Sequence, residues 1–230
     1  MAMSVSVDTS ANIPELPPAV TGPSAWRGPA MAASTEWLHH LSDDDVAEIE
    51  AAVTPLAERE VDIARITRSD FPLPNLAPKL TAICDEVIDG RGFALLRGLP
   101  VERWSVRQSA TAYFGIGCYF GNARMQNGKG HILGHVRDLG RDALNDPTAR
   151  VYQTRERQTF HTDSCDIVAL LCLKTAKSGG ASALVSSMTI YNEMLRRRPD
   201  LLVHLFTGLC TDRRGEVPAG EKPWHEIPVY

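Results

Sequence analysis

The hydrophobic and polar positions in the first half of the chain repeat with the period of an α-helix. Residues three and four apart share one face of a helix, so a stripe with this spacing predicts an amphipathic helix. The first stripe comprises Val46, Ile49, Val53 and Leu56. Ser42 and Asp45 form a capping-box-like start for this helix, and we expect Pro55 to break or kink it.

Two further helical patterns follow the first one. The second covers about 76–88, with Asn75 in the N-cap position and Gly90 as the stop signal. The third covers about 105–114. Between them, the short apolar run GFALLRGLP at 92–100 ends in glycine and proline, which predicts a buried strand.

From Gly130 onward the pattern changes to short segments typical of β-strands. They are HILGHV, RVYQT, QTFHTD, IVALLCLKT and SALVSS. One helical pattern at 189–198 interrupts them. Helices followed by a β-rich half predict an α+β protein with a sandwich or barrel. Residues 1–32 are rich in proline, serine, alanine and glycine, which indicates an extended or disordered lead-in to a folded domain at 33–230.

Composition narrows the functional class. The 230 residues are 43% hydrophobic and 23% charged, as in an ordinary globular protein, and the net charge of 24 − 28 = −4 argues against a nucleic-acid partner. The five cysteines form no CxxC pair, which indicates a reducing compartment and free, buried thiols. Because the chain has no secretory signal and no run of ~18 apolar residues, we expect a cytoplasmic protein without a membrane partner.

His161 and Asp163 are the strongest candidates for chemistry. On a strand, residues two apart point to the same face with their Cα atoms about 6.6 Å apart. One imidazole nitrogen and one carboxylate oxygen are two of the three ligands in the 2-His-1-carboxylate triad of non-haem Fe(II) oxygenases. The alternative is a His–Asp hydrogen bond at the end of a strand, in which the two groups share a proton.

The remaining histidines offer no convincing third ligand. His131 and His135 are four residues apart, which on a strand places them about 13 Å from each other, too far for one ion. His204 lies in a helical pattern and His225 in a strand-like segment. We therefore expect structural or surface roles for these side chains.

The order of motifs around this pair resembles a known family. FHTDS is followed, 18 residues after His161, by a glycine pair in KSGGASALVSS, and then by the helical pattern YNEMLRRRPDL. Together with the upstream GFALLRGLP, this order resembles the TauD/TfdA family of Fe(II)/2-oxoglutarate-dependent dioxygenases. The likeness is greatest from about Phe93 to Phe206.

The resemblance implies a double-stranded β-helix, the jelly roll of cupin-like proteins, with iron held in its mouth. It implies that His161 and Asp163 are iron ligands, with 2-oxoglutarate and O₂ as co-substrates. Ser182 falls where the family usually has a threonine or serine near the 2-oxoglutarate carboxylate. Its neighbour Ala181 departs from the acidic residue often found at that position.

The resemblance also implies a second iron-binding histidine and a 2-oxoglutarate-binding arginine, both far downstream of the glycine pair. The chain offers no match for either, so the sequence predicts a partial jelly roll that is incomplete at its C-terminus. An incomplete sheet exposes unpaired edges, which favours association into homo-oligomers.

Three functions remain open from the sequence. The first is a dioxygenase that hydroxylates a small organic acid or a related aliphatic molecule. The second is a catalytically inactive remnant of the fold that acts as a binding module. The third is an unrelated hydrolase built on a His–Asp dyad.

Overall fold

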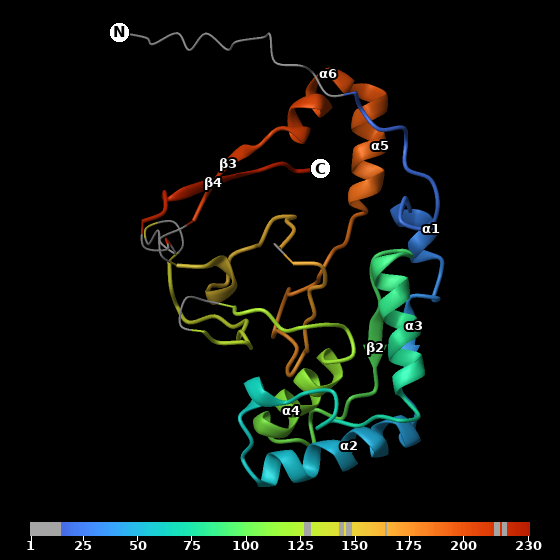
Figure 1. The fold of residues 1–230 in the computed structure, drawn as a ribbon, viewed down its shortest axis with the longest axis vertical. Coiled ribbons are helices and arrows are strands. Elements are labelled where there is room, and N and C mark those ends of the chain that lie inside the picture. The colour runs from blue at the N-terminus through green and yellow to red at the C-terminus, as the bar shows by residue number, and fades with distance from the viewer. Residues whose placement is uncertain are drawn as a thin grey trace. The chain divides into compact units, whose positions relative to one another are not determined.

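The computed structural model describes residues 15–126, 130–142, 145, 149–163, 165–213, 217 and 220–230. The chain forms two compact units. One is Gly22–Ser186, and the other combines Ser187–Tyr230 with the N-terminal segment up to Thr21. Figure 1 shows the elements of both.

The unit Gly22–Ser186 is a helical layer with a small parallel sheet. Its elements are α1 (Gly28–Ala32), β1 (Leu38–His40), α2 (Asp43–Glu58), the 3₁₀ helix η1 (Ile63–Arg65), α3 (Ala77–Ile88), β2 (Leu95–Arg97), α4 (Val106–Gly117) and the 3₁₀ helix η2 (Val151–Gln153). β1 pairs with β2 in register from Leu38 opposite Leu95 to His40 opposite Arg97. The strand predicted within 92–100 is therefore confirmed, although Leu95 is exposed rather than buried.

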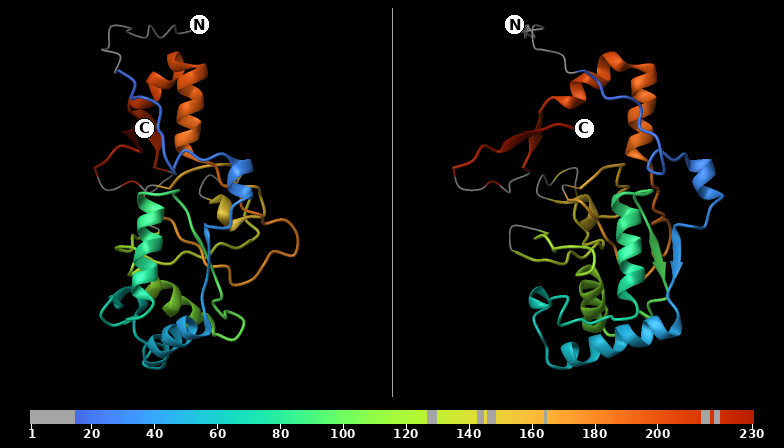
Figure 2. Two further views of the ribbon diagram at one scale, coloured as in Figure 1. Left: turned by 90° about the vertical axis from the view of Figure 1, so that its right-hand side faces the viewer. Right: turned by 45° about the vertical axis from the view of Figure 1, so that its right-hand side comes forward.

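The three long helices enclose the core of this unit. α2 lies across the ends of α3 and α4, as the views in Figures 1 and 2 agree. The predicted stripe on α2 is buried, and it packs with Phe71, Leu76 and Leu80 in one cluster. All three predicted helices form within a few residues of their expected bounds, since each carries an apolar face that only burial can satisfy.

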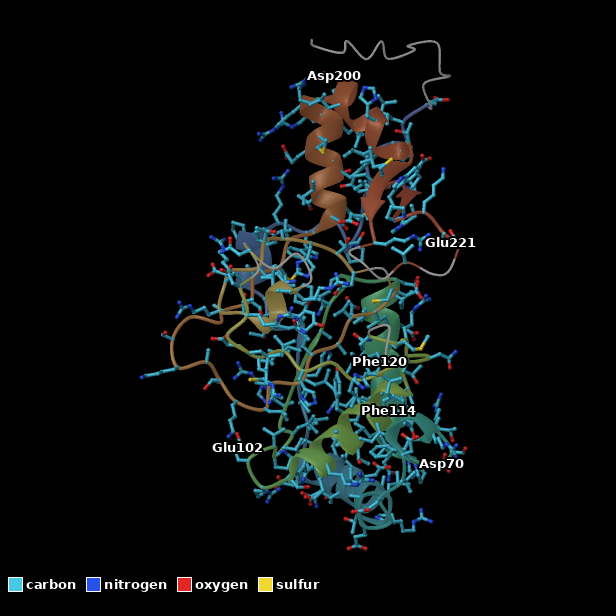
Figure 3. All side chains as sticks on the ribbon, turned by 90° about the vertical axis from the view of Figure 1, so that its left-hand side faces the viewer. Asp70, Glu102, Phe114, Phe120, Asp200 and Glu221 are labelled. Atoms are coloured by element: carbon cyan, nitrogen blue, oxygen red, sulfur yellow. The ribbon has the colours of Figure 1, made fainter. Side chains whose placement is uncertain are left out.

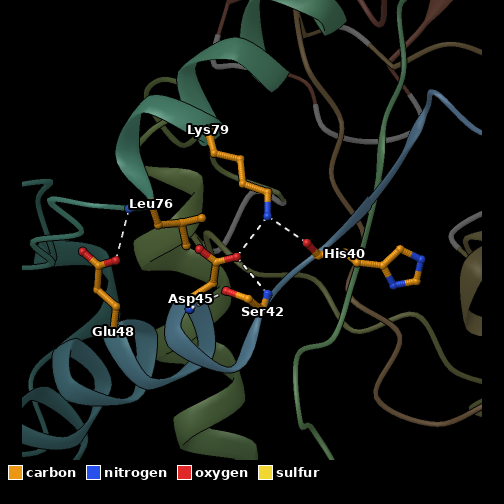
Figure 4. Close-up of polar contacts among 6 residues, drawn as sticks. All are labelled: His40, Ser42, Asp45, Glu48, Leu76 and Lys79. Atoms are coloured by element: carbon orange, nitrogen blue, oxygen red, sulfur yellow. Dashed lines mark hydrogen bonds and ion pairs between the residues drawn. The ribbon is translucent and has the colours of Figure 1, made fainter.

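The start of α2 is held by the capping box that its sequence predicts. The hydroxyl of Ser42 accepts a hydrogen bond from the Asp45 amide at 3.1 Å, and the Asp45 carboxylate accepts one from the Ser42 amide at 2.8 Å. Lys79 on α3 donates to the same carboxylate at 2.9 Å and to the carbonyl of His40 at 2.7 Å (Figure 4). One ammonium thus joins α3 to both α2 and β1.

Two local predictions for these helices are wrong. Asn75 does not cap α3. Instead, the Glu48 carboxylate on α2 accepts hydrogen bonds from the amides of Asn75 and Leu76 at 2.8 and 3.1 Å. Leu76 is the N-cap residue, so its bond, drawn in Figure 4, satisfies a donor that the helix start leaves open. Pro55 does not break α2, which continues to Glu58. The packing of Val53 and Leu56 on either side of the proline stabilises this last turn.

The second unit contains α5 (Ser187–Arg197), α6 (Pro199–Leu202), the 3₁₀ helix η3 (Val203–Phe206), β3 (Leu209–Asp212) and β4 (Trp224–Ile227). β3 and β4 form an antiparallel pair, with Leu209 opposite Ile227. The rings of Tyr191, Phe206 and Tyr230 contact one another and form the aromatic centre of this unit. The helix predicted over 189–198 is confirmed as α5.

The described part of the lead-in is anchored at several points. Residues 15–27 contain no helix or strand, as expected, but 28–32 form α1. The amide and carbonyl of Val20 both hydrogen-bond to the side-chain amide of Asn192 at 2.8 Å. Trp26 donates to the carbonyl of Arg91 at 2.8 Å, and its ring meets Phe93 edge-on.

The double-stranded β-helix is not formed by the described residues, whose only sheets are the pairs β1–β2 and β3–β4. None of the five strand-like segments after Gly130 is a strand in this structure. An apolar run becomes a strand only where a neighbour supplies a continuous ladder of hydrogen bonds. The described backbone supplies isolated bonds, such as those from the amides of Arg137 and Leu139 to the carbonyls of Tyr152 and Gln153, but no such ladder. The apolar positions of Ile167–Leu173 suit a buried strand, but this run is largely exposed, with Leu170 at 77%.

Two further observations concern the state of the cysteine thiols and the length of the helices. The five thiols are free, as predicted, but Cys165, Cys172 and Cys210 are exposed rather than buried. Among the described residues, no helix combines the length and apolar character needed to cross a membrane.

Candidate metal centre

The segment 158–163 is an irregular stretch that leads into the apolar run 167–173. The hydroxyl of Tyr113, on α4, donates a hydrogen bond to the carbonyl of Ala169 and ties this run to the helical layer. Burial raises the pKa of the Tyr113 hydroxyl, so it stays protonated and available as a donor at neutral pH. The scaffold therefore holds the segment through its C-terminal side.

The two nitrogens of His161 have different partners. Nδ1 lies 2.8 Å from the carbonyl oxygen of Thr159, and Nε2 lies 3.0 Å from the side-chain nitrogen of Gln158. A carbonyl can only accept, so Nδ1 carries the proton, and Nε2 accepts from the Gln158 amide. In this tautomer the Nε2 lone pair is directed at the Gln158 amide.

This arrangement is typical of a metal-ligating histidine. Such a residue donates its non-ligating N–H to a carbonyl or carboxylate, which fixes the tautomer and the ring orientation. Here the carbonyl of Thr159 has that role. The Gln158 amide must leave Nε2 before a cation can bind there.

Asp163 follows His161 by two residues, and its side chain is exposed. Among the described residues, no hydrogen bond or ion pair joins the two side chains. The structure therefore does not form the His–Asp dyad that the hydrolase alternative requires. The carboxylate contributes to the local potential instead. The pKa of the Cys165 thiol is raised mainly by burial and next by the negative charge of Asp163.

Ser182 is exposed and follows a sharp glycine turn. Gly179 and Gly180 have φ values of +70° and +73°, a left-handed conformation that side chains with a Cβ rarely adopt. A Cβ at Gly180 would also lie 2.9 Å from the Cβ of Ala176. The glycine pair therefore directs the chain at this turn, but no described contact joins Ser182 to His161 or Asp163.

The donor chemistry of His161 and Asp163 suits a ferrous ion, as two of the three protein ligands of a facial triad. The described residues contain no group of three or more histidine, cysteine, aspartate and glutamate side chains placed to hold a metal. His131 and His135 lie outside any helix or strand, while His204 lies in η3 and His225 in β4. Among the described residues, none of these four histidines belongs to such a group.

Sequence reasoning missed the partners of His161. Gln158 and the Thr159 carbonyl were predicted only as parts of a strand. A signal was available, since a glutamine three residues before a histidine can reach its ring in an irregular segment. On the predicted strand, Gln158 and His161 would point to opposite faces, so a hydrogen bond between them was not expected.

Comparison with known proteins identifies the class. Residues 52–229 match the family described as taurine catabolism dioxygenase TauD, TfdA family. The chain is 38% identical over 212 residues to FR-33289 synthase of Streptomyces rubellomurinus, a match covering 92% of this chain and 62% of that protein. It is 33% identical over 184 residues to a taurine hydroxylase-like protein of Stachybotrys chartarum, covering 77% of this chain and 48% of that protein.

The chain belongs to the TauD/TfdA dioxygenase family, and the resemblance seen in its motifs is confirmed. It spans less than two thirds of the length of these two relatives. Family membership implies a jelly roll of the cupin type, which the helices and short strands of the described residues do not confirm.

Proposed function

We propose that the protein is an Fe(II)/2-oxoglutarate-dependent dioxygenase that hydroxylates a small organic acid or a related aliphatic molecule. The observation that carries this proposal is the arrangement of His161, whose Nδ1 faces the Thr159 carbonyl at 2.8 Å and whose Nε2 faces the Gln158 side-chain amide at 3.0 Å. The family match and the hydroxylase-like and synthase names of the relatives support the same class of reaction.

In this proposal His161 and Asp163 hold the iron from the protein side. Bound Fe(II) supplies the activation of O₂, which converts 2-oxoglutarate to succinate and CO₂ and adds one oxygen atom to a substrate C–H bond. Asp163, with no described ion pair, contributes a carboxylate oxygen and one unit of negative charge. Ser182 is the proposed hydrogen-bond donor to 2-oxoglutarate, on the strength of its position after the glycine turn.

The relatives extend well beyond the matched region, so the activity of the whole protein is part of the proposal. We propose that the third ligand and the arginine that pairs with 2-oxoglutarate are contributed from outside the described residues. We also propose a cytoplasmic location and a small-molecule substrate, with no nucleic-acid or membrane partner. The acidic net charge supports the absence of a nucleic-acid partner.

The test compares three variants of the complete protein. His161→Ala and Asp163→Ala each remove one ligand, whereas His135→Ala removes an exposed histidine outside the site. We expect the first two to lose stoichiometric Fe(II) and to lower succinate formation at least a hundredfold, with unchanged circular dichroism. We expect His135→Ala to behave as the unmodified protein. Iron content and turnover that survive both ligand substitutions would contradict the metal assignment.

A second measurement separates the dioxygenase from the binding module. The dioxygenase releases succinate and CO₂ only when 2-oxoglutarate is present. The binding module retains Fe(II) but releases neither. Product formation that is equal with and without the keto acid would exclude the proposed co-substrate.

A further inference from the structure

A hollow of about 650 Å³ lies on the helical layer, between the loop that precedes α3 and the end of α4. Its walls come from Thr67, Arg68, Pro72, Pro74, Ala77 and Tyr119, among others. The volume lies in the range of sites for small molecules, about 300–1,000 Å³. Apolar side chains form most of this surface, and Arg68 is the positively charged residue in its lining.

The base of this hollow is rigid. The hydroxyl of Tyr119 donates to the carbonyl of Phe71 at 2.9 Å and accepts from the amide of Leu73 at 2.8 Å, so two hydrogen bonds fix the hydroxyl end of the side chain. Tyr119 and Leu73 are both buried. Pro72 and Pro74 restrict the backbone further, since each ring fixes its own φ. A ligand would meet a surface that needs little ordering.

Arg68 lies over the ring of Tyr119 at this base. Its guanidinium carbon lies 4.4 Å from the centre of the Tyr119 ring. Among the described residues it forms no ion pair or hydrogen bond. The nearby Asp70 carboxylate is occupied by the amide and hydroxyl of Thr67, at 3.0 and 2.6 Å. Asp70 marks this edge of the helical layer in Figure 3.

These features specify one kind of ligand. A guanidinium presents a planar fork of N–H donors that matches a carboxylate or sulfonate, and stacking on an aromatic ring fixes the plane of the fork. The adjoining proline, alanine and leucine surface accommodates a short hydrocarbon body. We propose that this hollow is a binding site for small organic monoanions with an apolar body, with Arg68 holding the acid group and Tyr119 supporting Arg68.

The site is testable on the protein with hexanoate as the probe, titrated by calorimetry and by NMR of the Tyr119 ring. Hexanoate should bind saturably and shift the ring signals. Acetate, which lacks the hydrocarbon body, should bind at least tenfold more weakly, and hexylamine, which reverses the charge, should not bind. Arg68 is exposed, so Arg68→Gln should fold normally and weaken hexanoate binding at least tenfold.

Two controls isolate the site. Arg65→Gln removes a neighbouring arginine whose side chain is 84% exposed, and it should change hexanoate binding by less than twofold. The double variant His161→Ala, Asp163→Ala should retain binding, so failure of the proposed dioxygenase function leaves this result unaffected. The inference is overturned if hexanoate does not saturate, if hexylamine binds equally well, or if Arg68→Gln binds like the unmodified protein. Loss of binding in the His161, Asp163 variant would also overturn it.

Discussion

Gly115 and Gly117, two residues apart at the end of α4 and thus on different faces of the helix, should respond in opposite ways to the same substitution. Gly115 is buried against Phe71, and a Cβ added there would lie 2.3 Å from the nearest ring carbon. Gly117 is exposed, and a Cβ added there meets nothing within 4 Å. Alanine at these two positions thus compares a crowded site with an open one on a single helix.

The magnitude follows from two opposing contributions. Carbon atoms rest at about 3.5 Å or more, so Gly115→Ala requires a local shift of about 1.2 Å against a fully buried ring. Overpacking of this kind costs about 1–3 kcal/mol, and the better helix propensity of alanine returns about 1 kcal/mol. Because the overlap is large, we expect a net loss of about 1–2 kcal/mol for Gly115→Ala. Gly117→Ala should gain about 0.5 kcal/mol, since it lies in the last turn.

Urea unfolding followed by circular dichroism measures both changes. With an m-value of about 2 kcal/mol/M, Gly115→Ala should lower the midpoint by about 0.5–1 M. Phe71→Leu removes the ring that the new methyl group meets, so the cost of Gly115→Ala should fall by at least about 0.5 kcal/mol in that background. Equal stabilisation by the two alanines, or an unchanged cost beside Leu at position 71, would refute the reasoning.

The remaining predictions concern the start of α2. Ser42→Ala should lower the free energy of unfolding by about 1 kcal/mol in urea, whereas exposed Thr54→Ala should stay within about 0.5 kcal/mol. Burial raises the pKa of Asp45, but hydrogen bonds from the Ser42 amide and Lys79 outweigh it and leave the pKa lowered. Asp45 therefore stabilises the folded state above the pKa that it has in the unfolded chain, and this stabilisation is lost as the pH falls through its lower folded-state pKa. In Asp45→Asn, the free energy of unfolding should change less over this acidic range.

The helices could be predicted from sequence because their signals are local. The Ser42–Asp45 capping box and the apolar stripe of α2 lie within one turn or two, so pattern and structure agree. The cap of α3 could not be predicted in the same way. Its donors are satisfied by Glu48, 27 residues before Asn75, and no local pattern indicates that carboxylate.

The candidate site likewise combines features that depend on neighbouring residues with features that depend on residues distant in sequence. His161 and Asp163 were found because they lie two residues apart and match a family motif. Their predicted strand geometry depended on ladder partners distant in sequence, and the described chain provides none for 158–163. The hydrogen bond from His161 to the Thr159 carbonyl arises from that irregular backbone, since an extended strand would direct the two groups apart.

The two halves of the Gly22–Ser186 unit differ in what stabilises them, and this difference bears on the metal centre. The helical layer fully buries Ile49, Phe71 and Leu80, so its own side chains stabilise it. Leu170 and Leu184, on either side of the glycine turn, stay 77% and 62% exposed, which leaves a hydrophobic driving force of about 25 cal/mol per Å² unused. The bond from Tyr113 holds this segment to the layer at Ala169 but does not cover it. The tautomer of His161 is therefore set by its immediate neighbours, whereas no hydrogen bond or ion pair between described residues fixes the distances among His161, Asp163 and Ser182. In the proposed centre, the choice of ligand residues is a local property of the sequence, whereas local contacts do not fix their geometry.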